Sequence, residues 1–269
     1  MKTDDRSNKK EERAGAVLAP PRAFPPGWNG KARRPPLGWR SWNAFGNKIN
    51  QSTMVAAMDA LVASNRTIGG KAGQSLCKDV GFCSAGLDEG WEACGVGVNH
   101  TQHDAQGRPT VNTTRFPSMR AMVDHGHSLG LEVGFYENGC KCAEKIDNPV
   151  NYRGDIESLQ EYGFDGVKMD DCGAQKNMTL YAEIMVASGK NFSIENHKKP
   201  EHSECGVSGD SSCPSQSWCP FNWFRSSHDI NTKPESWIGN LQTTVMFLGN
   251  PPLSQPGCWA YPDVRPVPS

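Results

Sequence analysis

Acidic residues follow one β-prone segment after another in this chain of 269 residues. They stand directly behind apolar stretches, and the most prominent of them are Asp88, Glu89, Asp170, Glu195 and Asp229. Two carboxyl groups at a suitable separation can divide a reaction between them, one as nucleophile and the other as general acid and base. The pattern therefore predicts an enzyme whose chemistry is carried by carboxylates at strand ends.

The charge balance restricts the partners of such an enzyme. The 28 basic and 29 acidic residues leave a formal net charge of −1, so no basic surface for a nucleic acid is expected. The longest apolar runs, such as 245–248, are far shorter than the ~20 residues that cross a bilayer, so no membrane partner is expected. A neutral, sugar-like substrate fits this composition better than a polyanion.

The elements that must position the carboxylates alternate between strand and helix patterns after Pro36. Strand-like segments are expected at 37–42, 80–87, 131–136, 166–170, 191–195 and 222–226, with a seventh ending near 263. Apolar residues at helical spacing lie between them, at 54–62, 116–129, 152–162, 178–187 and 237–248. Helices between consecutive strands imply an α/β fold with parallel strands and helical crossovers.

Carboxylates at the ends of many strands favour a (β/α)8 TIM barrel over a doubly wound open sheet. An open sheet would be expected to bind its ligand beside a glycine-rich phosphate turn, and the sequence has no G-x-G-x-x-G or Walker A motif. With seven strand segments counted, the prediction is a barrel incomplete at its C-terminus, with about seven of eight βα units. Residues 1–32 are expected to be a disordered leader. Residues 33–269 would then form the barrel domain, without the last βα unit or a C-terminal β-sandwich.

Five sequence blocks occur in order and at barrel-strand intervals. They are PPLGWRSWNAFG at 35–46, GLDEGW at 86–91, GFDGVKMDDC at 163–172, FRSSHDI at 224–230 and PGCWAYPDV at 256–264. Together they resemble glycoside hydrolase family 27, the retaining α-galactosidases and α-N-acetylgalactosaminidases, over about residues 33–264. The resemblance implies a barrel with its active site at the strand ends and no metal or other cofactor.

The resemblance also implies catalytic roles for two residues. The aspartate of the K-x-D motif is the family's nucleophile, which here is Asp170. The aspartate that closes R-x-x-x-D is the general acid/base, which here is Asp229. Lys168 lies two residues before Asp170, on the same face of the strand, where it can keep the nucleophile ionised.

Further residues match the sugar pocket of the family. The residues implied in substrate binding are Trp42, Asp88, Glu89, Tyr136, Lys168, Glu195, Arg225 and Asp263. Trp42 resembles the aromatic platform under galactose. Asp88 and Glu89 match the pair that binds the 4- and 6-hydroxyls, and Glu195 matches a glutamate near the 2-hydroxyl, which favours galactose over N-acetylgalactosamine.

Three departures from the family pattern bear on the substrate more than on the reaction. The family's D-D-C-W is D-E-G-W at 88–91, its S-x-C-E-W neighbourhood is S-I-E-N-H at 193–197, and its W-N-D-P-D is W-A-Y-P-D at 259–263. His197, His202 and His228 are expected at the surface or behind the pocket rather than as ligands.

Ten cysteines and six N-x-S/T triplets point to the secretory pathway. The triplets begin at Asn50, Asn65, Asn99, Asn112, Asn177 and Asn191. A secreted or lysosomal/vacuolar glycoprotein with disulfides is therefore expected, although no signal peptide is visible; a cytosolic protein with free thiols is the alternative. By the family resemblance, Cys172 pairs with a cysteine of the preceding βα loop, with Cys142 preferred over Cys140.

The predicted function is hydrolysis of terminal α-D-galactosyl residues by double displacement, with a small carbohydrate or glycoconjugate as substrate and a homodimer as a compatible assembly. The alternatives within the family are an α-N-acetylgalactosaminidase, a β-L-arabinopyranosidase and an inactive sugar-binding paralogue. A Mg²⁺-dependent barrel enzyme is a third class, against which the ammonium of Lys168 among the acids argues.

Overall fold

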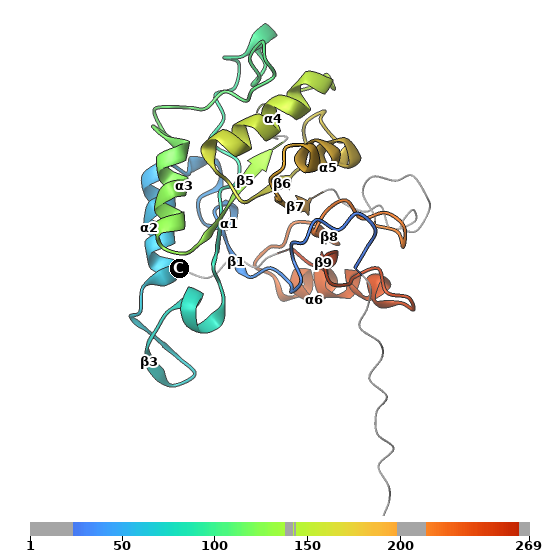
Figure 1. The fold of residues 1–269 in the computed structure, drawn as a ribbon. Helices are drawn as coiled ribbons and strands as arrows, with labels where there is room; N and C mark the ends of the chain where they lie inside the picture. Colours follow the sequence, from blue (N-terminus) through green and yellow to red (C-terminus); the bar gives the residue numbers. More distant parts are fainter. Residues whose placement is uncertain (1–23, 138–141, 143, 198–213, 264–269) are drawn as a thin grey trace, which may run out of the picture.

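The computed structural model describes residues 24–137, 142, 144–197 and 214–263. Seven strands form one parallel sheet in the order β1-β4-β5-β6-β7-β8-β9 (Figure 1). Their bounds are β1 Gly38–Arg40, β4 Ser84–Gly86, β5 Glu132–Glu137, β6 Gly166–Met169, β7 Ser193–Asn196, β8 Trp223–Arg225 and β9 Trp259–Tyr261. Each strand lies beside the next one along the chain, so the sheet is an incomplete (β/α)8 barrel, as predicted.

Helices cover the outside of this curved row of strands (Figure 1). They are α1 Trp42–Phe45, α2 Gln51–Val62, α3 Met119–Ser128, α4 Pro149–Tyr162, α5 Met178–Ala187 and α6 Pro234–Thr243. Single turns are 3₁₀ Gly46–Lys48, π-helical Leu76–Val80, 3₁₀ Val98–His100 and 3₁₀ Val245–Leu248. None of the helices in the described part of the chain is long and apolar enough to cross a bilayer.

Local sequence signals explain where several helices begin. The side chains of Asn50, Ser118, Asn148 and Asn177 cap α2, α3, α4 and α5 by accepting hydrogen bonds from backbone N–H groups of the first turn. Helix α4 ends at Gly163, whose φ of 88° is readily adopted only by glycine. The chain can therefore turn straight into β6, which carries the K-x-D motif.

The apolar helix faces predicted from the sequence form the core between helices and sheet. Met54, Met58 and Leu61 of α2 are buried, and so are Met122 and Val123 of α3. Phe135 packs between Trp91 and Phe164, with ring centroids 4.5 Å apart in both pairs. This core fixes β4, β5 and β6 relative to one another.

Two predicted elements differ from the structure. The segment 80–87 is not one strand, because the Cys77–Cys83 disulfide closes a π-helical turn and leaves only Ser84–Gly86 for β4. The helix expected at 237–248 breaks after Thr243, and the apolar residues Leu241 and Val245 are exposed rather than packed on the sheet. A short hairpin of β2 Arg66–Ile68 and β3 Lys71–Gln74 was not predicted.

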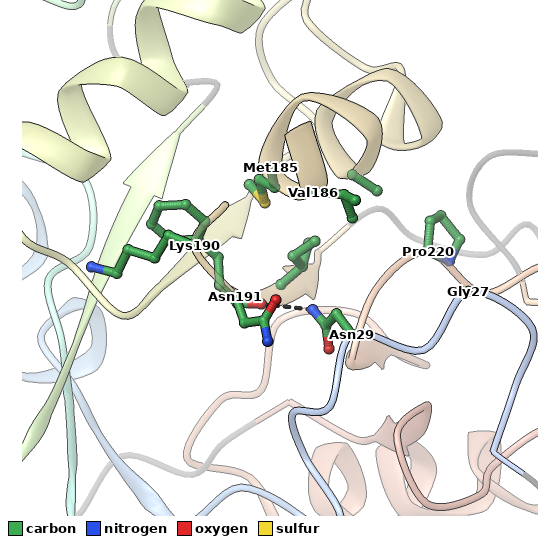
Figure 2. A pocket seen from close by; sticks show the side chains of 10 residues that line it. Gly27, Asn29, Met185, Val186, Lys190, Asn191 and Pro220 are labelled. Atoms are coloured by element: carbon green, nitrogen blue, oxygen red, sulfur yellow. Dashed lines mark hydrogen bonds between the residues drawn. The ribbon is translucent and has the colours of Figure 1, made fainter. Parts of the chain in front are cut away.

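The ordered fold also begins earlier than the predicted boundary at residue 33. Asn29 and Asn222 exchange side-chain hydrogen bonds of 3.2 and 2.8 Å, and Asn29 Nδ2 donates to the Phe192 carbonyl at 2.7 Å. Figure 2 shows this segment beside α5, where it borders a small pocket that also includes Met185 and Pro220. The segment 24–32 therefore packs against the barrel, where the sequence predicts a leader up to residue 32.

None of the residues predicted for the active site lines the small pocket in Figure 2. Its walls come from the N-terminal segment, α5 and the start of β7. The strand-end carboxylates lie elsewhere, so this pocket is not the catalytic site.

Candidate active site

The register of the parallel strands brings the predicted residues to one level of the sheet. Lys168 of β6 lies opposite Tyr136 of β5 and Glu195 of β7. Asp170 follows β6 immediately. Because parallel strands expose their carboxyl ends at the same edge, four of the predicted residues share one site.

Asp170 is held by donors from three segments of the chain. Its Oδ1 accepts from the backbone N–H of Asp171 at 2.8 Å, and its Oδ2 accepts from the hydroxyl of Tyr136 at 2.8 Å. His197 Nδ1 lies 3.3 Å from Oδ1. Burial raises the pKa of Asp170, but the hydrogen bond from His197, the charge of Lys168 and the hydrogen bond from Tyr136 outweigh it and hold the pKa well below the ordinary aspartate value. The group therefore stays an ionised carboxylate, as a nucleophile must.

Lys168 bonds directly to Asp88 and acts on Asp170 through its charge. Its Nζ contacts Asp88 Oδ2 at 2.9 Å and lies 5.2 Å from the centre of the Tyr136 ring. Its charge acts on Asp170 through space, since it lowers the pKa of that carboxyl. Lys168 thus balances two acidic residues from β6 and the end of β4.

A buried ion pair that was not predicted crosses the barrel interior. Arg40 of β1 contacts Glu195 Oε2 at 2.6 Å and donates to the Leu87 carbonyl at 3.2 Å. A Cβ on Gly86 would lie 3.0 Å from the guanidinium carbon, so the glycine leaves room for this side chain. Sequence reasoning missed Arg40, although its position two residues before Trp42 on a strand was a usable signal.

Glu195 is fully engaged by protein groups. Arg40 binds one of its oxygens, and the hydroxyl of Tyr261 donates to the other. Burial raises the pKa of Glu195, but the charges of Arg40 and Lys168 and the hydrogen bond from the Tyr261 hydroxyl lower it to about 2. A sugar hydroxyl would have to share Glu195 with these partners. Tyr261 was likewise not predicted as part of the site.

Arg225 and Asp229 form a second pair at the end of β8. Nη1 of Arg225 hydrogen bonds to Asp229 Oδ1. Only 3% of the Arg225 side chain is exposed, against 76% of the Asp229 side chain, so the arginine is anchored and the aspartate faces outward. The loop after Asp229 is held by Asp263, whose Oδ2 accepts from the Ile230 N–H at 2.9 Å. Asp263 therefore positions the loop that carries Asp229.

Charge interactions connect this pair to the Asp170 cluster. Burial lowers the pKa of His197, and the charge of Arg225 adds to this effect; burial raises the pKa of Tyr261, and the charge of Arg225 partly opposes that rise. Because such effects need proximity in a partly dry interior, Arg225 belongs to the same site as Glu195 and His197.

The remaining predicted residues flank this centre. Trp42 opens α1 directly behind β1 and is 41% exposed, so its ring is accessible to a ligand. Glu89 is buried beside Asp88, and the charge of each raises the pKa of Tyr136. His197 was expected at the surface or behind the pocket, and it lies buried behind Asp170. His228 is exposed, and His202 lies outside the described residues.

The predicted disulfide between Cys142 and Cys172 is wrong. Cys142 bonds to Cys94, with a Cα–Cα distance of 5.1 Å, because the long loop after β4 reaches the loop after β5. Cys172 is disulfide-bonded, and Cys140, the alternative partner, lies outside the described residues. A third bridge joins Cys219 to Cys258 and ties the segment before β8 to the start of β9.

A barrel with an ionised aspartate and further acidic and basic residues at its strand ends is typical of glycoside hydrolases. The melibiase family model described as alpha galactosidase A matches residues 34–193, which is more than half of the chain. The chain therefore belongs to the α-galactosidase (melibiase) family of glycoside hydrolases.

The individual relatives agree with this family. An α-galactosidase of Cyamopsis tetragonoloba is 29% identical over 148 residues, which are 54% of this chain and 32% of the relative. A family 27 β-L-arabinopyranosidase of Geobacillus stearothermophilus has a similar fold, with a TM-score of 0.66, 15% identity and coverage of 90% and 63%. For α-galactosidase I of Mortierella vinacea the TM-score is 0.59, with 17% identity and coverage of 87% and 60%. The chain spans about a third of the length of the curated relatives it matches.

Proposed function

We propose that the protein is a retaining exo-glycosidase that removes terminal α-D-galactosyl residues from oligosaccharides or glycoconjugates. The observation that carries this proposal is the ionised Asp170 at the carboxyl end of β6, bound by Tyr136 and His197. A carboxylate that stays charged in a buried, cation-rich setting is suited to attack an anomeric carbon. The family and the α-galactosidases among its relatives support galactose as the sugar.

In the proposed reaction Asp170 forms a bond to the anomeric carbon while the bond to the leaving oxygen breaks. Asp229 gives its proton to that oxygen as it leaves. In the second step Asp229 takes a proton from water, whose oxygen displaces Asp170 from the sugar. The two inversions leave the released galactose in the α configuration.

Arg225 supports the binding of a hydroxylated ligand in this site. Its Nε is buried and has no hydrogen-bond partner among the described residues. A buried donor without a partner is costly, and a sugar hydroxyl would satisfy it. Trp42, Asp88, Glu89 and Glu195 are proposed as further sugar contacts on the family match.

Secretion or delivery to a lysosome or vacuole is proposed with the activity. The three disulfides among the described residues and the six N-x-S/T triplets support an oxidising compartment.

No cluster of three or more metal-ligating side chains occurs within the described ranges.

The proposal is tested by turnover of 4-nitrophenyl α-D-galactopyranoside, with the matching α-N-acetylgalactosaminide and β-L-arabinopyranoside in parallel. The α-galactoside should have the highest kcat/KM, EDTA should leave it unchanged, and Asp170→Asn should abolish it. Proton NMR of early product should show α-galactose. Early β-galactose would exclude double displacement and recast Asp170 as a general base.

A further inference from the structure

His197 connects β7 to the carboxylate at the end of β6. It follows β7 directly, only 7% of it is exposed, and its Nδ1 lies 3.3 Å from Asp170 Oδ1. The same oxygen accepts from the N–H of Asp171, while Tyr136 holds the other oxygen. The three donors come from different segments, so together they fix the plane of the carboxylate.

We propose that His197 is a positioning residue for the nucleophile, donating Nδ1–H to Asp170 Oδ1 as a neutral imidazole. This inference rests on the proposed function, since it assumes that Asp170 attacks the sugar. A carboxylate can only accept, so the contact requires a proton on Nδ1. Rotation of the Asp170 carboxylate would break the contact, and the histidine therefore keeps the attacking group in one orientation.

The charges around His197 explain why the neutral form is the working one. Asp170 and Lys168 face it from β6, Arg225 faces it from β8, and Glu195 lies on its own strand. Burial, Lys168 and Arg225 lower the pKa of His197 below the ordinary histidine value, and they outweigh Asp170, which raises it. In neutral solution the site therefore holds an uncharged donor.

Protonation of His197 would then weaken the nucleophile. An imidazolium stabilises the ionised carboxylate of the ground state more than the transition state, in which the carboxylate loses charge to the new bond. The pKa of Asp170 lies too low to produce a fall in activity in mildly acidic solution. We therefore expect an acid limb in kcat/KM below the ordinary histidine pKa, caused by the titration of His197.

Two substitutions separate the hydrogen bond from the titration. In His197→Asn the amide N–H can take the place of Nδ1–H but cannot be titrated, whereas His197→Phe fills the space without a donor. Relative to wild type at pH 7, the His197→Asn enzyme should retain kcat/KM within about 5-fold, and its pH profile should lack the acid limb. The His197→Phe enzyme should have a kcat lower by roughly 10- to 100-fold, with KM little changed. His127→Asn, at an exposed histidine of α3, is the matched control and should behave as wild type.

A second measurement keeps this inference separate from the proposed function. In ¹⁵N-histidine NMR of the full chain, His197 should carry its proton on Nδ1, and Asp170→Asn should lower its pKa, because a negative neighbour is removed. Absence of both effects overturns the inference, and so does a His197→Phe enzyme with wild-type kcat and pH profile. If the wild type lacks galactosidase activity but the NMR effects are present, the positioning contact stands and the proposed function fails.

Discussion

A buried histidine outside the active site offers the sharpest test of the electrostatics of this fold. His103 lies on the long loop after β4, with Nδ1 2.6 Å from Glu144 Oε2 and Nε2 2.8 Å from Asp155 Oδ1. Both carboxylates belong to the neighbouring unit, in the loop after β5 and in α4. The Cys94–Cys142 disulfide joins the same two loops. His103 therefore fastens the loop that begins at Asp88 and Glu89.

The pKa of His103 determines how much its contacts with Glu144 and Asp155 stabilise the fold. Burial lowers it, but the hydrogen bonds and charges of Asp155 and Glu144 raise it to about 9, against 6.5 in the unfolded chain. Each pKa unit corresponds to about 1.4 kcal/mol, so the shift is worth about 3 kcal/mol. Since the folded pKa is the higher one, this stabilisation is fully present below pH 6.5 and is lost as the pH rises through 9.

His103→Gln tests this stabilisation through urea unfolding of the disulfide-intact chain at pH 6 and pH 9.5. At pH 6 the variant should be less stable than wild type by about 3–5 kcal/mol, because two buried carboxylates lose their cation. At pH 9.5 the difference should shrink by about 3 kcal/mol.

The matched control is His125→Gln, whose histidine forms a half-exposed pair with Asp59 at 2.8 Å. Such a pair should contribute less than about 1 kcal/mol. A wild-type-minus-variant difference for His103 that does not change between pH 6 and pH 9.5 would refute a charged His103 in the folded protein.

Three further predictions concern other contacts. Arg40→Met should destabilise the fold by about 3–5 kcal/mol in urea unfolding, because Glu195 loses its cation. Adding Glu195→Gln should recover much of this loss. If it recovers none, Arg40 stabilises the fold through packing rather than through its charge. Asn29→Ala should lower the free energy of unfolding by about 1–3 kcal/mol in the same assay. A decrease below about 0.5 kcal/mol would show that the segment 24–32 is not part of the cooperative fold. Asp229→Ala should spare 2,4-dinitrophenyl α-galactoside within roughly 10-fold but lower kcat for alkyl galactosides by about 10³-fold or more; equal losses on both substrates would remove Asp229 as the acid.

The sequence predicted the barrel well because two strong periodic signals agreed. The apolar residues of α2 and α3 recur at helical spacing and are buried at those positions, and β6 was found within a residue of its bounds. Apolar strands followed by carboxylates, such as 166–170, mark the functional edge of a parallel sheet. These features depend on local spacing, which a single sequence displays.

The errors arose where contacts between distant segments decide the outcome. Residues 24–32 look like a leader by composition, and only the partners of Asn29 on other segments show that they are ordered. The family resemblance paired Cys142 with Cys172, but the partner of Cys142 is Cys94, 48 residues away in the sequence. These groups meet because of the paths that the loops take in the folded chain, and a local sequence pattern does not reveal such a path.

The site shows the same division between residues found by motif and residues found by geometry. Motif matching selected Lys168 on β6 and Asp170 directly after that strand. It missed Arg40 and Tyr261, because their contacts with Glu195 depend on the register across the barrel. Arg40 on β1 and Tyr261 on β9 both reach this acid of β7.

The unpredicted residues explain how so many acids share a small volume. Asp88, Asp170 and Glu195 would repel one another in a dry interior, since like charges at close range cannot all remain ionised without compensation. Lys168 and Arg40 supply that compensation within hydrogen-bonding distance of Asp88 and Glu195. Asp170 instead has neutral donors and a more distant cation, which keep it charged while leaving it less neutralised than its neighbours. The cations thus fix the acids that are proposed to bind the sugar, and the uncharged donors hold the acid that is proposed to react.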